Sequence, residues 1–237
     1  MRAEFTVRRS RRARRARVTL GEQGDVVVVL PDRAPERVAG ELVERQWRWI
    51  GNQQRRISEQ QRNLAARPAI GEGRTISLRG LPLDVVVEPD TRSRRYSHVE
   101  VEVTSPPVIV VRLASTDRRP AAVLLDGWLR GAARHDLEQR VAARAAQMKV
   151  EPRRLSIRDQ RSRWGSASRR GTLSFSWRLV LCPPDILDYV AVHELAHLRY
   201  AGHGERFWAL VRRHVPAADH YRRWLRRNEL WLRRALD

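Results

Sequence analysis

The sequence predicts an α+β fold, and three patterns support this prediction. Residues 75–113 alternate apolar and polar side chains or form short β-branched runs, which is typical of strands. Between residues 120 and 148 the apolar side chains recur at steps of three and four, the period of a helix. The remainder after residue 177 is again helical in pattern, with interruptions near Gly202 and at Pro216. We therefore expect a β-rich N-terminal region with one helix at 1–117, packed on a core with C-terminal helices at 118–237.

Before residue 75 the sequence predicts a β-hairpin followed by a helix. Arginines dominate residues 8–17, and on their own they would indicate a disordered basic arm. The apolar segments 18–20 and 26–30, joined by a turn-forming segment, instead predict a β-hairpin that ends at Pro31. Pro35 suits the first turn of a helix, which we expect to fade among the polar residues 53–62.

The charge, the cysteine content and the length of apolar stretches limit the classes of function that the sequence can have. The 237 residues carry 47 lysines and arginines against 27 acidic residues, a net charge of +20, which favours phosphates, nucleic acid or acidic surfaces as partners. A single cysteine, Cys182, excludes an internal disulfide framework. No stretch of 18 apolar residues is present and no apolar segment follows the N-terminal arginines, so we expect a cytoplasmic protein without a membrane span. The oligomeric state is not indicated.

The motif H-E-x-x-H at residues 193–197 is the most informative segment. On a helix, His193 and His197 lie one turn apart on the same face, so both imidazoles can reach one metal ion. Glu194 lies about 100° further round the helix, where its carboxylate can reach a water on that ion. Two structural histidines are the alternative. The apolar flanking turns argue against it, because three polar groups in a buried helix are costly without a shared partner.

A catalytic zinc needs a third protein ligand and an open position. His203 follows His193 by ten residues, the offset of the third histidine in H-E-x-x-H-x-x-G-x-x-H, although Tyr200 replaces the glycine. Glu205 is the alternative ligand. We favour Zn²⁺ bound by His193, His197 and His203. Such a zinc lowers the pKa of its water, and Glu194 acts as general base in its attack on a carbonyl. Arg163, Tyr200 and Tyr221 are candidates for stabilising the oxyanion.

Several segments together resemble a known family. They are S-R-W-G-S at 162–166, L-S-F-S-W-R-L at 173–179, L-D-Y-V at 187–190 leading into the H-E-x-x-H motif, and His203 with F-W at 207–208. This set resembles the YgjP-like metallopeptidase family, which is related to SprT-like and WLM-type proteases. Residues 118–215 match best, and a weaker likeness extends to the arginines at 8–9. The resemblance implies a zincin-like core and a zinc metalloprotease with the ligands and base named above.

The resemblance also bears on substrate and partners. It implies a peptide or protein substrate, and SprT-type relatives act on proteins attached to DNA, which would suit the basic surface. Ala167 and Ser176 depart from the family pattern, where cysteine and often asparagine occur. Trp164 and Trp177 flank a short loop beside the predicted site, and segment 172–177 could receive a peptide by strand addition, or its aromatics could be core residues. The predicted substrate contacts are Arg163, Trp164, Ser176 and Trp177.

Two other functions remain open at this point. The first is a zinc-dependent hydrolase of phosphoanhydrides such as nucleotides, with arginines as phosphate clamps. The second is a nucleic-acid-binding module in which the metal is structural. The favoured function is hydrolysis of peptide bonds by a zinc-activated water with Glu194 as general base.

Overall fold

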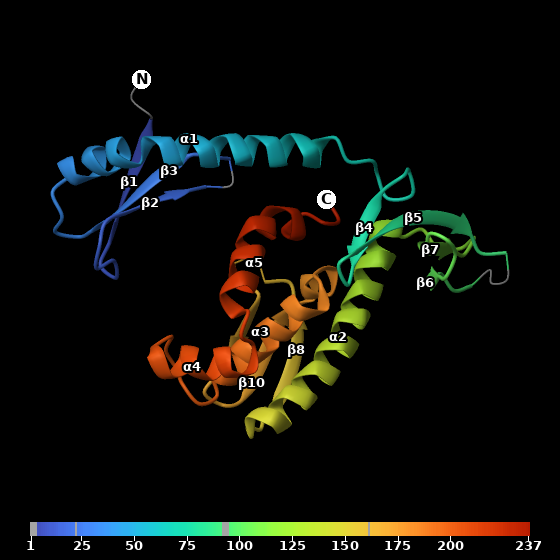
Figure 1. The fold of residues 1–237 in the computed structure, drawn as a ribbon. Helices are drawn as coiled ribbons and strands as arrows, with labels where there is room; N and C mark the ends of the chain where they lie inside the picture. Colours follow the sequence, from blue (N-terminus) through green and yellow to red (C-terminus); the bar gives the residue numbers. More distant parts are fainter. Residues whose placement is uncertain (1–3, 22, 92–94, 161) are drawn as a thin grey trace. The chain divides into compact units, whose positions relative to one another are not determined.

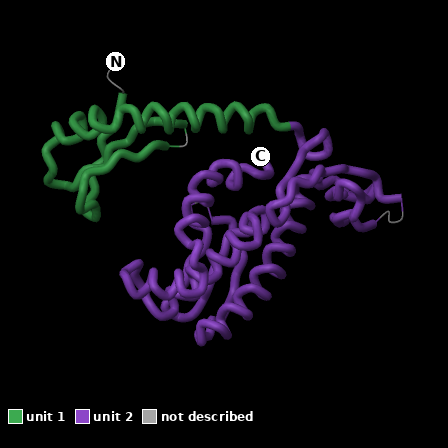
Figure 2. The backbone as a smooth tube through the Cα atoms, in the orientation of Figure 1, with its two compact units in different colours: residues 1–67 green, residues 68–237 purple. Residues whose placement is uncertain are grey.

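The computed structural model describes residues 4–21, 23–91, 95–160 and 162–237 (Figure 1). The chain divides into two compact units, residues 1–67 and 68–237, called unit 1 and unit 2 below (Figure 2). The described residues form five α-helices and three small sheets, so the fold is α+β. No helix among them is long and apolar enough to cross a bilayer.

Unit 1 is a three-stranded sheet with one long helix. The strands are β1 (Phe5–Ser10), β2 (Arg17–Leu20) and β3 (Val26–Pro31), with β3 in the middle, parallel to β1 and antiparallel to β2. The predicted hairpin is therefore confirmed as β2 and β3. Helix α1 (Arg37–Ala65) packs on this sheet through an apolar stripe that includes Leu42 and Ile50.

Two features of unit 1 differ from the sequence predictions. Arg8 and Arg9 belong to strand β1, which pairs with β3 while both arginine side chains stay exposed. Helix α1 does not fade at 53–62 but continues to Ala65. The reason is that glutamine, arginine and glutamate are good helix formers even where no apolar stripe continues.

Unit 2 begins with a four-stranded sheet. Its strands are β4 (Thr75–Leu78), β5 (Leu81–Pro89), β6 (His98–Glu102) and β7 (Val108–Leu113), in the order β4-β5-β7-β6. One face packs on helix α2 (Ala121–Met148), where Ile109 and Val111 share a core with Leu125 and Leu129. The boundary predicted near residue 117 thus falls inside unit 2, since the sheet and α2 bury their apolar faces against each other.

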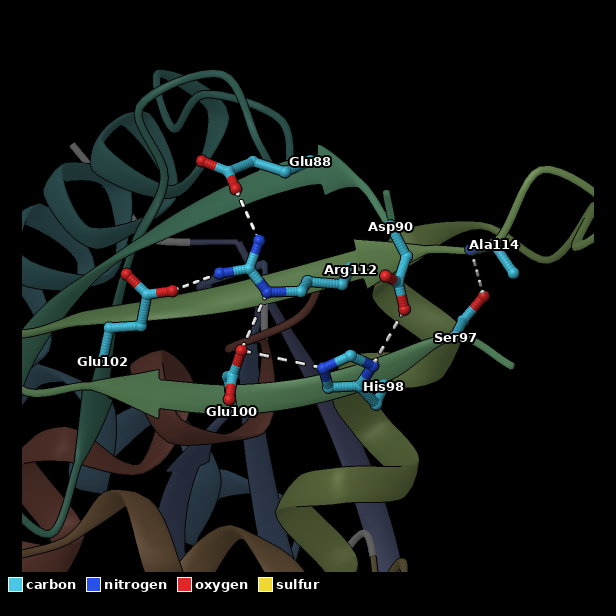
Figure 3. A network of polar contacts seen from close by, with 8 residues as sticks. All are labelled: Glu88, Asp90, Ser97, His98, Glu100, Glu102, Arg112 and Ala114. Atoms are coloured by element: carbon cyan, nitrogen blue, oxygen red, sulfur yellow. Dashed lines mark hydrogen bonds and ion pairs between the residues drawn. The ribbon is translucent and has the colours of Figure 1, made fainter. Parts of the chain in front are cut away.

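Arg112 of β7 organises the polar side chains of this sheet (Figure 3). Its guanidinium donates hydrogen bonds to Glu88 on β5, at 2.8 Å, and to Glu100 on β6, at 2.8 Å, and also pairs with Glu102. His98 lies between Asp90, at 3.4 Å, and Glu100, at 3.6 Å (Figure 3). The hydrogen bond from Arg112 lowers the pKa of Glu100 below its ordinary value of 4.5.

We expect Arg112→Met to lower the melting temperature at neutral pH, because three carboxylates on neighbouring strands lose their shared cation. A carboxylate with a lowered folded-state pKa stabilises the fold above its ordinary pKa, and that contribution is lost as pH falls through the lowered value. The difference from wild type should therefore shrink in acid, below the ordinary pKa of 4.5. Thermal denaturation across pH checks this, with Arg134→Met, an exposed pair with Glu138, as control. A deficit independent of pH would contradict the electrostatic explanation.

The second half of unit 2 holds the H-E-x-x-H motif. Strands β8 (Arg154–Arg158), β9 (Gly165–Ala167) and β10 (Thr172–Ser176) form a sheet with β10 in the middle, and a short 3-10 helix η1 (Trp177–Leu181) follows. Segment 172–177 is therefore not a free edge for strand addition, since β8 and β9 occupy both of its sides. The edge strand β9 arises within the segment predicted as a loop at 165–171.

Three helices complete unit 2: α3 (Pro184–Ala196), α4 (Glu205–His214) and α5 (Ala218–Arg233). Helix α3 is central, with contacts to α2, α4, α5, η1 and β9. Such a position requires a helix that is apolar on most sides, and ten of its thirteen residues are buried. Asp188, one of these, accepts a hydrogen bond of 2.8 Å from Arg144 on α2, which ties the two helices together.

Candidate metal centre

Helix α3 carries the motif on its last turn. The helix opens with Pro184 in its first turn and Asp185 beside the N-terminal amides, both favourable at that end. It ends at Ala196, and His197 is its C-terminal capping residue. His193 and Glu194 therefore lie on a buried helix whose end opens toward the turn leading to α4.

Three imidazoles converge at this end of α3. His193, His197 and His203 each offer a ligand atom, and these atoms all lie within 4.8 Å of one another. The Nε2 atoms of His193 and His203 are 3.2 Å apart. His203 comes from the turn between α3 and α4 and is exposed, whereas the other two are partly buried. Among the described residues, this is the one cluster of three or more His, Cys, Asp or Glu side chains that could hold a metal ion.

Aromatic side chains hold the imidazoles in place. Phe207 of α4, fully buried, lies 4.9 Å from the ring of His193, 4.6 Å from His197 and 4.8 Å from His203, centroid to centroid. Trp208, the next residue, also contacts the rings of His193 and His203, at 5.8 and 5.9 Å between centroids. The rings are thereby fixed by packing before any ligand binds, which is the preorganisation that a metal site requires.

The hydrogen bonds and pKa values of the histidines suit metal binding. His197 Nδ1 lies 3.0 Å from the carbonyl oxygen of Tyr200, a bond that would leave Nε2 with its lone pair. Burial, and then the neighbouring His197 and His203, lower the pKa of His193 to about 3. Burial also lowers the pKa of His203. Both rings are accordingly neutral at pH 7, the state in which imidazole binds a metal.

The short distance between the Nε2 atoms of His193 and His203 is a further indication of a metal site. At 3.2 Å one of the two nitrogens could donate a hydrogen bond to the other. Three rings around one point cannot, however, supply hydrogen-bond partners for all of their facing nitrogens. A divalent ion with three nitrogen ligands at about 2.0–2.1 Å brings those nitrogens to such separations. The residues present therefore fit a metal ion, and three imidazoles are a donor set that zinc favours.

Glu194 lies next to this cluster, and its carboxylate is buried. Burial raises the pKa of Glu194 to about 7, and the positive charge of Arg163 acts in the opposite direction. Strand β9 passes directly over the side chain: a Cβ atom on Gly165 would lie 2.7 Å from Glu194 Cγ and 2.7 Å from Oε1. Only glycine at residue 165 leaves room for the carboxylate in this position.

Gly165→Ala should displace the Glu194 carboxylate while leaving the three imidazoles where they are. Because misplacement by about 1 Å can cost about 10²-fold in rate, we expect a fall of about 10- to 100-fold in kcat with an unchanged metal content. Steady-state kinetics and metal analysis check this. Gly131→Ala, whose new Cβ has no neighbour within 4 Å, is the matched control. Equal kcat for both variants would show that β9 does not position Glu194.

The structure separates the four predicted substrate contacts into two groups. Arg163 is exposed and Trp164 is half-buried beside the edge strand β9, with Arg233 stacked on the Trp164 ring at 4.8 Å. Ser176 and Trp177 are fully buried, and the guanidinium of Arg178 lies 4.5 Å from the Trp177 ring. Burial favours a packing role for these two, whereas contacts to substrate through Arg163 and Trp164 stay a prediction.

The structure also shows where the alternative metal ligand and the candidates for stabilising the oxyanion lie. Glu205, the alternative ligand, is the first residue of α4 and is not part of the cluster of three histidines. Tyr200 contributes its carbonyl oxygen to His197, and the Tyr221 hydroxyl pairs with Asp185. Arg222 of α5, which approaches the cluster through Trp208, was not singled out from the sequence, because one arginine among so many carries no signal.

Comparison with known protein families shows to which family the chain belongs. The YgjP-like metallopeptidase domain matches residues 14–228. The chain belongs to this family. The search found no significant match among curated proteins, and none among solved structures.

Membership of this family indicates the general class of reaction and of substrate. As a YgjP-like metallopeptidase domain, the chain is a metal-dependent hydrolase with a peptide or protein substrate. The match covers part of unit 1 as well as most of unit 2, and within unit 1 it includes strands β2 and β3 and helix α1 but not strand β1. Neither the family match nor the described structure supports nucleic-acid binding, which stays a prediction together with a cytoplasmic location.

Proposed function

We propose that this YgjP-like domain is a zinc metallopeptidase with a zincin-like core, in which His193, His197 and His203 hold the zinc and Glu194 is the general base. The convergence of three imidazoles within 4.8 Å at the end of α3, beside a buried carboxylate, is the observation that supports the proposal most strongly. A structural metal would not need that carboxylate, whereas hydrolysis requires a base at this place.

The chemistry divides between the ion and the protein. A zinc held by three neutral imidazoles supplies Lewis acidity, which lowers the pKa of water toward 7 and polarises a carbonyl group. Glu194 accepts the proton of the attacking water and returns it to the leaving amine. Its raised pKa, about 7, suits this role, because the ideal pKa of a proton-transfer group lies near the working pH. The Tyr200 carbonyl orients His197.

Strand β9 offers a place for the substrate backbone. It contacts α3 and is an edge of its sheet among the described strands, so a peptide can add to it by main-chain hydrogen bonds. A peptide in that position would pass over Gly165, next to Glu194. Arg163 and Trp164, which immediately precede β9, would then contact the substrate side chains.

A turnover assay with two substrate classes tests the proposal. The full chain, loaded with zinc, is assayed on a peptide mixture and separately on nucleoside triphosphates, each with and without a chelator. We expect chelator-sensitive cleavage of peptides and no turnover of triphosphates. Turnover of triphosphates alone would replace the proposal with the phosphoanhydride hydrolase, and the absence of both activities would favour a structural metal.

A further inference from the structure

Two arginines, one from α4 and one from α5, contact the indole ring of Trp208. The guanidinium of Arg212, on α4 itself, is 5.7 Å from the ring centroid, and that of Arg222, on α5, is 5.3 Å away. Arg212 has an acidic partner, since it pairs with Asp219 at 3.3 Å. For Arg222 the described part of the chain shows no hydrogen bond and no ion pair. The two differ, then, in whether their charge is balanced.

Arg222 is also the arginine that approaches the metal centre through Trp208. The indole contacts the rings of His193, at 5.8 Å, and of His203, at 5.9 Å and 31° between planes. The indole of Trp208 thus contacts both this cation and two rings of the imidazole cluster.

A second cation at this place is unfavourable without an anion. A divalent ion on the imidazoles and a guanidinium nearby repel each other, and that repulsion is strongest in a partly buried site. An anionic group bound between them is attracted by both charges. The cation–π contact with Trp208 also restricts the position of the guanidinium, whose paired N–H groups match the two oxygens of a carboxylate.

We propose that Arg222, held on Trp208, forms an anion-binding subsite beside the metal centre that selects peptides with a carboxylate next to the bond to be cleaved. The proposal deepens the peptidase function above and rests on it for the substrate class. A carboxylate can come from an Asp or Glu side chain or from a free peptide C-terminus. Arg222 binds and orients that group, which places the neighbouring peptide bond at the imidazole cluster.

Binding measurements on the full chain test the subsite separately from catalysis. Three peptides of equal length are titrated calorimetrically into metal-free protein and into zinc-loaded Glu194→Gln protein. One contains a Glu and an amidated C-terminus, one is neutral with a free C-terminal carboxylate, and one is neutral and amidated. We expect at least one carboxylate peptide to bind about tenfold more tightly than the neutral amidated peptide, and the tighter of the two identifies the source of the carboxylate.

Two variants assign this preference to its residue. Arg222→Gln should weaken binding of the preferred peptide about tenfold and leave the neutral amidated peptide unchanged, and Arg222→Lys should restore part of the loss. Arg223→Gln, an exposed arginine one position along the same helix, is the matched control and should change neither. Equal affinities for all three peptides, or a preference that survives Arg222→Gln in protein with an unchanged melting temperature, would overturn the subsite. A preference without any peptide hydrolysis would uphold the subsite and reject the peptidase function.

Discussion

Replacing Glu194 with glutamine should lower the rate of peptide hydrolysis by orders of magnitude while the protein keeps its metal. The amide has nearly the same shape as the carboxylate but cannot accept the proton of the attacking water. A positioned general base contributes about 10²- to 10⁴-fold, so kcat should fall by that factor. The three histidine ligands do not involve this side chain, and therefore metal affinity should stay within about threefold of wild type. Kinetics and metal titration on the same preparation measure both quantities.

The control for this variant is Glu138→Gln, an exposed glutamate on α2. It loses the same charge outside the cluster of three histidines and should retain full activity. If Glu194→Gln hydrolyses peptides as fast as Glu138→Gln, another group acts as the base, and the buried carboxylate beside Gly165 has a structural role only.

Removing one imidazole should remove the metal. Because loss of a group that only orients a ligand already costs about 10- to 100-fold in metal affinity, loss of a ligand itself should cost more than about 100-fold. We expect this of His203→Ala, whose exposed side chain can be removed without opening a cavity in the core. Hydrolysis should disappear with the metal.

Thermal denaturation gives a second measure of the same change. A ligand that binds only the folded state stabilises it by about 4 kcal/mol at a thousand times its dissociation constant. Added zinc should therefore raise the melting temperature of wild type and of His135→Ala, a variant of an exposed histidine on α2, but not of His203→Ala. An equal increase in all three would place the bound zinc elsewhere.

Much of the site could be predicted because its information is local. His193 and His197 are brought together by the period of a helix, and the apolar residues around them predict a buried helix. The position of His203 depends on the turn between α3 and α4. Its spacing from His193 predicts it as the third ligand, and the structure brings its imidazole together with the other two. The family resemblance to YgjP-like metallopeptidases is confirmed over residues 14–228.

The features that could not be predicted depend on contacts between distant segments. Strand β1 forms only because β3 provides a partner, and no local pattern among arginines indicates this. The middle position of β10 follows from its pairing with both β8 and β9. The closeness of Gly165 to Glu194, which are 29 positions apart in the sequence, and the contact of Arg222 with Trp208 likewise arise only when the helices and the sheet pack together.

The central claim is that one zinc ion is bound by three histidines with a position left open for water. A crystal structure of the zinc-loaded chain, with anomalous diffraction recorded on both sides of the zinc absorption edge, tests it most directly. We expect one anomalous peak at about 2.0–2.1 Å from a nitrogen of His193, His197 and His203, with no fourth protein ligand. A peak that excludes His203, or a fourth protein ligand closing the site, would contradict the proposed enzyme.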